Sequence, residues 1–429
     1  MTPLLRNTAG FFTRACKRFL LGAISLPFRA GSEGAAPDAS SGAAVDVVHA
    51  ETPRARRPEV QRESVARRLL RSRWLVIGTG VVIGVLAPVL VKAGNPGNMG
   101  VCVACFNRDI AGALGLHRAA AVQYIRPEII GIVLGSLASA VFFREFRPRT
   151  GSAPLVRFLL GAFAVIGALV FLGCPWRAYL RLGGGDWNAI LGIGGLIAGI
   201  AVGVVFLRMG YTLGRSRAAP FSLGWMMPLL MVGLLLLLLF EPKLGRDAEG
   251  NAVGPIFFSE SGPGSQYAPL AVSLVVGLAI GALAQRSRFC TIAGVRDFIL
   301  MRDTHLLSGI LALIAAAFVT NAVLGQFHAG FDGQPVAHTE HLWNFSGMAL
   351  AGLAFTLAGG CPGRQLVLSG EGDGDAAVFA LGMIFGAGFA HTFSLASSPA
   401  GHGVYGPAAV VIGLVFCAAV GLTMREARG

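Results

Sequence analysis

The sequence predicts an all-α polytopic membrane protein, with about ten transmembrane helices in two inverted repeats that carry re-entrant half-helices. Three observations predict this fold class. First, 54% of the 429 residues are hydrophobic and only 13% are charged, more apolar surface than a soluble fold of this length can hide. Second, apolar runs of about 20 residues, enough to cross a hydrocarbon core of roughly 30 Å, recur along the chain. Third, the two halves carry matching motifs.

Residues 1–73 are predicted to be a basic, partly disordered extension. Basic side chains alternate with Phe and Leu at roughly helical spacing in 1–31, as in a segment that lies on a membrane or acts as a signal. Residues 32–53 are patternless and predict a flexible linker. The arginine-rich block 54–73 precedes the first span and is expected to stay in the cytoplasm.

Two membrane repeats are predicted at 74–240 and 269–424, with a periplasmic linker at 241–268 and a cytoplasmic tail at 425–429. The predicted spans are 74–93, 125–143, 155–173, 188–207, 222–240, 269–285, 305–326, 343–360, 375–395 and 404–424.

The arginines predict the orientation of the spans. Short loops after the second and fourth spans are rich in arginine, whereas the loops 327–342 and 396–403 contain no Lys or Arg. Cytoplasmic loops carry the excess of basic residues, so both termini are expected in the cytoplasm of a bacterium, with the chain in its inner membrane. The formal charge of +13 is thereby attributed to topology and to contacts with lipid headgroups, and no nucleic-acid partner is expected.

Motifs recur in the two halves at an offset near 187. Cys174-Pro-Trp-Arg177 matches Cys361-Pro-Gly-Arg364, and each is followed by an aspartate twelve residues after the cysteine, Asp186 and Asp373. An earlier C-x5-R-D pattern recurs as well: it begins at Cys102 with Arg108, and at Cys290 with Arg296. Five spans per repeat is an odd number, so the second copy must be inverted, as in many transporters.

The motif segments 94–118, 174–187, 286–302 and 361–374 are too short and too rich in glycine and charge to span the membrane. Irregular backbone survives at membrane depth only where it is buried in protein or lines a cavity. We therefore predict re-entrant half-helices. Proline suits the first helical turn, which makes Cys174 and Cys361 the expected N-cap residues.

Helix N-termini favour anions and thiolates, and an arginine one turn further adds a charge-assisted donor. Arg108, Arg177, Arg296 and Arg364 are the candidate anion-guiding residues; the alternative for such an arginine is a structural role, binding carbonyl groups or lipid phosphate. Asp186 and Asp373 follow glycines and are predicted to be structural caps.

Five cysteines are the candidate substrate relay: Cys102, Cys105, Cys174, Cys290 and Cys361. A row of thiols suits a solute with a soft sulfur or selenium terminus better than a hard oxyanion. Cys102-Val-Ala-Cys105 is a C-x-x-C without further ligands nearby, so neither a metal nor a cofactor is expected. Cys16 and Cys417 are expected to be packing residues.

These observations favour a transporter rather than an enzyme. Two alternatives stay open: a membrane thiol–disulfide oxidoreductase that uses Cys102 and Cys105, and a channel for a neutral molecule, which would not need the arginine beside each Cys-Pro.

Together with Gly94-Asn-Pro-Gly-Asn-Met-Gly-Val-Cys102 and Arg286-Ser-Arg-Phe-Cys290, these motifs resemble the YeeE/YedE sulfur-transport family, and in particular its YedE-type selenium transporters. The resemblance covers about residues 74–424. It implies an hourglass-shaped protein that imports thiosulfate, passing it between cysteines of a central constriction, here Cys102, Cys174, Cys290 and Cys361. It also implies three partners: a small sulfur or selenium anion, membrane lipid and a cytoplasmic sulfur- or selenium-carrier protein. The sequence does not separate thiosulfate, selenite and selenide.

Overall fold

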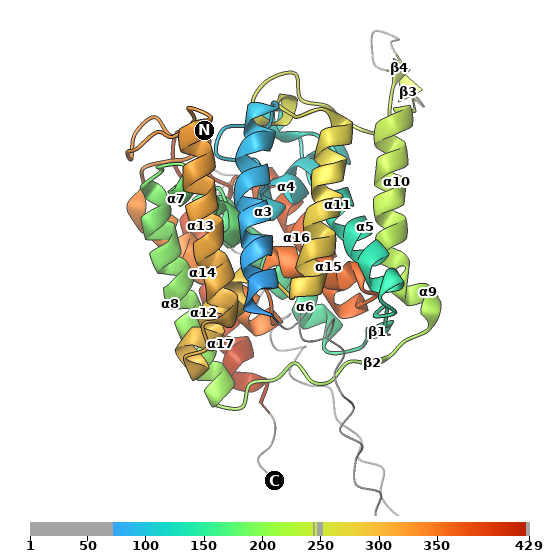
Figure 1. Ribbon diagram of the computed structural model, residues 1–429, viewed down its shortest axis with the longest axis vertical. Helices are drawn as coiled ribbons and strands as arrows, with labels where there is room; N and C mark the ends of the chain where they lie inside the picture. The colour runs from blue at the N-terminus through green and yellow to red at the C-terminus, as the bar shows by residue number, and fades with distance from the viewer. Residues whose placement is uncertain (1–71, 243–244, 247–251, 426–429) are drawn as a thin grey trace, which may run out of the picture. The chain divides into compact units, whose positions relative to one another are not determined.

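The computed structural model describes residues 72–242, 245–246 and 252–425, and almost all of its regular structure is helical (Figure 1). The extension predicted at 1–73 lies outside the described residues except for its last two positions. Ten helices follow the predicted spans: α3 Arg73–Lys92, α5 Pro127–Phe142, α6 Pro154–Phe171, α8 Asn188–Arg208, α10 Met226–Phe240, α11 Leu270–Ser287, α13 His305–Val323, α14 His341–Ala358, α16 Gly374–Thr392 and α17 Gly406–Thr423.

Nine helical segments of the described part are long and apolar enough to cross a membrane. They correspond to nine of the predicted spans, which confirms an all-α polytopic membrane protein. The remaining predicted span is α10, an apolar helix of 15 residues. At 1.5 Å per residue it is about 22 Å long, shorter than a typical hydrocarbon core.

Four short helices stand between the long ones: α4 Val103–Ala113, α7 Pro175–Gly183, α12 Thr291–Met301 and α15 Pro362–Gly370. Each comes at most eleven residues after the end of a long helix. The non-helical backbone before α4 is held by Asn95, whose Nδ2 donates to the Gly100 carbonyl at 3.0 Å and to Glu128 Oε1 at 2.8 Å. This explains how irregular backbone is satisfied inside the bundle.

The helix contacts repeat themselves between the two halves. Because α3 corresponds to α11 and α5 to α13, the contact of α3 with α13 has the contact of α11 with α5 as its counterpart. In the same way the contact of α8 with α14 corresponds to that of α16 with α6. Figure 1 shows α3 beside α11. The five helices that follow predicted spans, α3, α5, α6, α8 and α10, come before α11, so α3 and α11 run in opposite directions. The structure therefore has the pseudo-two-fold arrangement that the inverted duplication predicts.

Helices α6 and α14 pack against each other close to this pseudo-axis, and glycines allow their approach. A Cβ added to Gly167 of α6 would overlap the main-chain oxygen of Gly347 of α14. Small residues at such crossings bring membrane helices into backbone contact.

Only short strands occur in the described part. β1 (Arg149–Thr150) pairs with β2 (Arg217–Ala218), and β3 (Gly245–Arg246) pairs with β4 (Ala252–Val253), both antiparallel. Figure 1 places the β1–β2 pair at the end of the helix bundle opposite to β3–β4, which lies in the 241–268 linker. The remaining elements are one short helix and two single 3-10 turns: α9 Phe221–Gly224, η1 Ala120–Val122 and η2 Pro263–Ser265.

Candidate functional site

All four half-helices begin at a cysteine. The N-cap residues of α4, α7, α12 and α15 are Cys102, Cys174, Cys290 and Cys361. The sequence predicted this position for Cys174 and Cys361 from the following proline. It did not predict it for Cys102 and Cys290, which are followed by Val and Thr and so lack the proline signal.

The first-repeat cysteines form one thiol pair. The side chains of Cys102 and Cys174 are neighbours, and both are fully buried. Cys102 Sγ also accepts from the main-chain N of Cys105 at 3.3 Å. The N-termini of α4 and α7 therefore meet at two adjacent sulfur atoms.

The second-repeat cysteines form an equivalent pair. Cys290 Sγ accepts from the main-chain N of Ala293 at 3.4 Å and from that of Cys361 at 3.3 Å. Cys361 Sγ accepts from the main-chain N of Arg364 at 3.3 Å. In each repeat two half-helices thus direct their N-terminal N–H groups and the positive ends of their dipoles toward one pair of thiols, an arrangement that favours an anion.

Cys105 stands beside the first pair and has Ala293 as its counterpart. Its Sγ accepts from Nη1 of Arg177 at 3.4 Å. The Arg177 guanidinium is fully buried and also donates to main-chain carbonyls: from Nε to Asn98 at 2.7 Å, from Nη2 to Val336 at 3.0 Å and from Nη1 to Leu172. Arg177 therefore connects the Cys105 thiol, beside the first pair, to three separate backbone segments.

Arg364 has a different environment from its counterpart Arg177. Its Nη1 lies 3.1 Å from Glu371 Oε1, and the same oxygen lies 2.9 Å from Nη1 of Arg288. Arg288 reaches on to Glu145 at 2.8 Å. A chain of alternating charges thus runs from Arg364 to the half-exposed Arg288.

Glu145 lies in the loop between α5 and α6. Burial raises its pKa, but hydrogen bonds from Gln285 and Arg286, together with the charge of Arg288, have the larger combined effect and hold the pKa of this carboxyl below its usual value. Glu145 is therefore ionised at neutral pH and fixes the two arginines that precede Cys290.

The other two candidate arginines are paired with the aspartates that follow them. Arg108 Nε lies 2.8 Å from Asp109 Oδ1, and Arg296 Nε lies 2.8 Å from Asp297 Oδ1. Asp109 also binds Arg126 at 2.7 Å, with both side chains fully buried. Asp297 balances the charge of Arg296, whereas the single carboxylate of Asp109 is shared by Arg108 and Arg126.

The two candidate caps lie at the starts of long helices. Asp373 is the N-cap residue of α16 and accepts from the main-chain N of Ala376 at 3.0 Å; it also pairs with Arg149 at 2.7 Å. Asp186 accepts from the main-chain N of Asn188, the first residue of α8, at 3.0 Å. Its second oxygen lies 2.6 Å from Arg181 Nε.

Two further charged residues contact the candidate site residues but were not predicted from the sequence: Glu371, which pairs with Arg364, and Arg181, which pairs with Asp186. Comparison of the repeats could not find them, because Gly184 and Leu368 stand at the corresponding positions of the other repeat. Cys417 is buried in α17, and Cys16 lies outside the described residues. Nowhere in 72–242, 245–246 and 252–425 do three His, Cys, Asp or Glu side chains gather closely enough to hold a metal ion.

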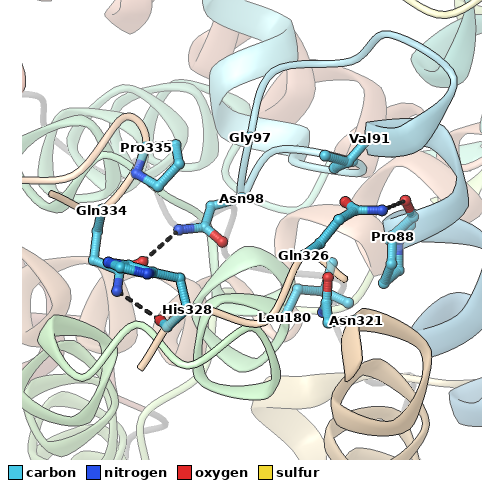
Figure 2. Close-up of a pocket in the computed structure, with 12 residues that line it drawn as sticks. Pro88, Val91, Gly97, Asn98, Leu180, Asn321, Gln326, His328, Gln334 and Pro335 are labelled. Carbon is cyan, nitrogen blue, oxygen red and sulfur yellow. Dashed lines mark hydrogen bonds between the residues drawn. The ribbon is translucent and has the colours of Figure 1, made fainter. Parts of the chain in front are cut away.

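A cavity of about 240 Å³ lies near the first thiol pair. Figure 2 shows its polar wall, where Asn98 donates to Gln334 and Gln334 donates to the main-chain oxygen of His328. Because the main-chain oxygen of Asn98 accepts from Arg177, one residue separates the cavity from this guanidinium. The lining residues are Ala87, Pro88, Val91, Gly97, Asn98, Gly100, Leu180, Asn321, Gln326, His328, Gln334 and Pro335.

Comparison with curated proteins gives partial similarity. The chain is 24% identical over 253 residues to the H(+)/Cl(-) exchange transporter ClcA of Yersinia pestis and of Yersinia pseudotuberculosis. The aligned part covers 48% of this chain and 49% of those proteins, so the chain spans about half the length of the curated relatives it matches.

A family model described as sulphur transport matches residues 39–202 and 286–423. The match begins at residue 39, whereas the resemblance seen in the sequence covers only about residues 74–424. The match leaves out 203–285, which contains α9, α10 and the linker. It includes every cysteine of the two thiol pairs. Because the two matched regions make up more than half of the chain, this protein belongs to the YeeE/YedE sulfur-transport family and is a multi-pass membrane protein.

Proposed function

We propose that this protein imports a small sulfur- or selenium-containing anion, of the thiosulfate type, through a central path lined by Cys102, Cys105, Cys174, Cys290 and Cys361. The observation that carries the proposal is the presence of two thiol pairs, each at the meeting point of two half-helix N-termini. The solute is passed from the first pair to the second without any change of oxidation state.

The chemistry of each pair suits such a solute. The oxygen end of a thiosulfate-type anion is attracted by the helix N-termini. Its soft sulfur or selenium end is matched by polarizable thiols. Sulfate offers only hard oxygen atoms and gains nothing from the thiols. The curated relatives are named as chloride exchangers, which agrees with an anion as the transported species.

The four candidate arginines divide into two groups under this proposal. Arg177 and Arg364 each follow a cysteine of a thiol pair by three residues. Arg177 has no acidic partner among the described residues and attracts the anion to the first pair, whereas Arg364 is paired with Glu371 and attracts the anion less strongly to the second pair. Arg108 and Arg296 are paired with Asp109 and Asp297, so they hold α4 and α12 in place.

The cavity beside Arg177 is proposed as the outer vestibule. With both termini in the cytoplasm of a bacterial inner membrane, the 327–342 loop that lines this cavity is periplasmic. The opposite mouth, at Arg288 and Glu145, then faces the cytoplasm and is where a sulfur- or selenium-carrier protein would receive the solute. Reporter fusions at 330–340 should be active in the periplasm and fusions after Met424 in the cytoplasm; the reverse pattern would contradict this orientation.

The oxidoreductase alternative has less support. Exchange with an external disulfide or quinone needs an accessible thiolate, whereas the side chains of Cys102 and Cys105 are both 0% exposed. No observation favours it over transport.

The experiment is uptake into proteoliposomes that contain the purified protein. Radiolabelled thiosulfate should enter at least ten times faster than in liposomes without protein, and unlabelled selenosulfate should compete with it, whereas sulfate and chloride should not. Equal competition by sulfate would contradict the role of the thiols. The absence of any thiosulfate uptake by folded protein would contradict the proposed substrate class.

A further inference from the structure

Trp176 breaks the symmetry of the two Cys-Pro-x-Arg motifs. It lies between Pro175 and Arg177 in α7, and the residue at the corresponding position of α15 is Gly363. Of these two equivalent positions, one therefore carries tryptophan, the largest residue type, and the other glycine, the smallest. The Trp176 side chain is 0% exposed.

The ring of Trp176 fills the space that Gly363 leaves. A Cβ added to Gly363 would overlap Cζ2, Cε2 and Cη2 of the indole. On another side the ring meets Phe289, with centroids 6.0 Å apart and an interplanar angle of 65°. Phe289 precedes Cys290, and Gly363 follows Cys361 by two residues. Trp176, a residue of the first repeat, therefore packs against residues that flank both cysteines of the second pair.

The indole N–H of Trp176 has no partner. Its Nε1 atom is buried and without a hydrogen bond to any described residue. A buried donor without an acceptor is destabilising, and each such group in a native structure calls for an explanation. An oxygen-bearing anion at the level of the ring would supply the missing acceptor.

We infer that Trp176 is the barrier and selectivity residue between the two thiol pairs. When no solute is present, its ring packs against Gly363 and closes the path. As the solute passes, its Nε1–H donates a hydrogen bond to an oxygen of the solute. The donor role rests on the proposed function. The barrier role does not, because it concerns whether any small ion can pass.

The test measures passive leak and uptake separately in proteoliposomes. Trp176→Ala and Trp176→Leu remove the ring, so chloride leak, followed with a fluorescent indicator, should rise about tenfold or more above that of the wild type. Trp176→Phe keeps a flat ring but no N–H, so the liposomes should stay tight. Its thiosulfate uptake should fall about tenfold, the loss expected when one hydrogen bond to an anion is removed.

Trp225 provides a matched control. Its Nε1 is also buried and without a partner, but its ring packs against Phe146 and Phe221 at the β1 end of the helix bundle, away from the cysteines. Trp225→Phe should therefore change neither leak nor uptake. Leu is included beside Ala because it fills more of the space left by the ring, and detergent-solubilised melting curves identify variants that are folded.

Each outcome tests one claim: the barrier role of Trp176, its donor role, or the proposed function. If folded Trp176→Ala and Trp176→Leu liposomes stay as tight as the wild type, the barrier role is wrong. If Trp176→Phe takes up thiosulfate at the wild-type rate, the donor role is wrong. If wild-type protein shows no thiosulfate uptake, the proposed function fails, while the leak comparison still decides the barrier role.

Discussion

Arg364 and Glu371 form a partly buried ion pair, with Nη1 and Oε1 3.1 Å apart, that has no equivalent in the first repeat. The position corresponding to Glu371 is Gly184, and Arg177 binds main-chain carbonyls instead of a carboxylate. The two halves of the duplication therefore hold their arginines differently: the charge of Arg177 is uncompensated by an acidic side chain, whereas that of Arg364 is compensated. We expect an anion to bind more tightly at the first pair than at the second, a gradient that suits release.

Glu371→Gln should weaken this gradient. The amide still accepts a hydrogen bond from Arg364 but no longer cancels its charge, so the second pair should hold an anion more tightly by roughly 1 kcal/mol, about fivefold in affinity. We expect a lower KM and a lower maximal rate of thiosulfate uptake, with the effect reduced at high salt. Glu340→Gln, which removes a carboxylate at the loop pair with His402, is the control. An unchanged KM in well-folded Glu371→Gln would show that the pair does not act on the solute.

Lysine should be tolerated at position 364 but not at 177. The Arg177 fork reaches three carbonyls and Cys105 Sγ, and the single ammonium of lysine cannot satisfy such separated acceptors. Arg364 needs only to meet Glu371. Arg177→Lys should lose about 2–4 kcal/mol of stability, as for a buried network with unpaired members, seen as a drop in Tm, while Arg364→Lys should lose less than 1 kcal/mol. Equal Tm values for the two lysine variants would contradict the difference in environment.

The charge chain at Glu145 predicts an acid-sensitive component of stability. The pKa of Glu145 is lowered in the folded protein, so its stabilisation is complete above the usual pKa of about 4.5 and is lost as the pH falls through the lower, folded-state value. The Tm of the wild type should therefore fall between about pH 5 and pH 3 by more than that of Glu145→Gln. Parallel Tm profiles for the two proteins over this range would mean that Glu145 does not stabilise the fold through its charge.

Periodicity and repeat comparison predicted most of the fold, because spans and half-helices each follow from local composition. The Cys-Pro pairs at Cys174 and Cys361 marked helix starts by a local rule. The pairing of Cys102 with Cys174, and of Cys290 with Cys361, joins segments more than 70 residues apart, and no local rule predicts it. The repeat comparison did not find Glu371 and Trp176 because a glycine stands at the equivalent position of the other repeat. Glu371 pairs with Arg364 and Arg288 of its own repeat, whereas Trp176 packs against Gly363 and Phe289 of the other repeat.

In the proposed relay, the thiols themselves contact the passing solute. Serine is a favoured N-cap residue, so Cys174→Ser and Cys361→Ser keep the helix starts while they remove the soft sulfur. Uptake of radiolabelled thiosulfate into proteoliposomes should fall at least tenfold in each variant, with Tm within a few degrees of the wild type, whereas Cys417→Ala, a substitution in α17 away from both pairs, should transport normally. If well-folded Cys174→Ser and Cys361→Ser both transport thiosulfate at the wild-type rate, the cysteines only cap helices and the relay is wrong.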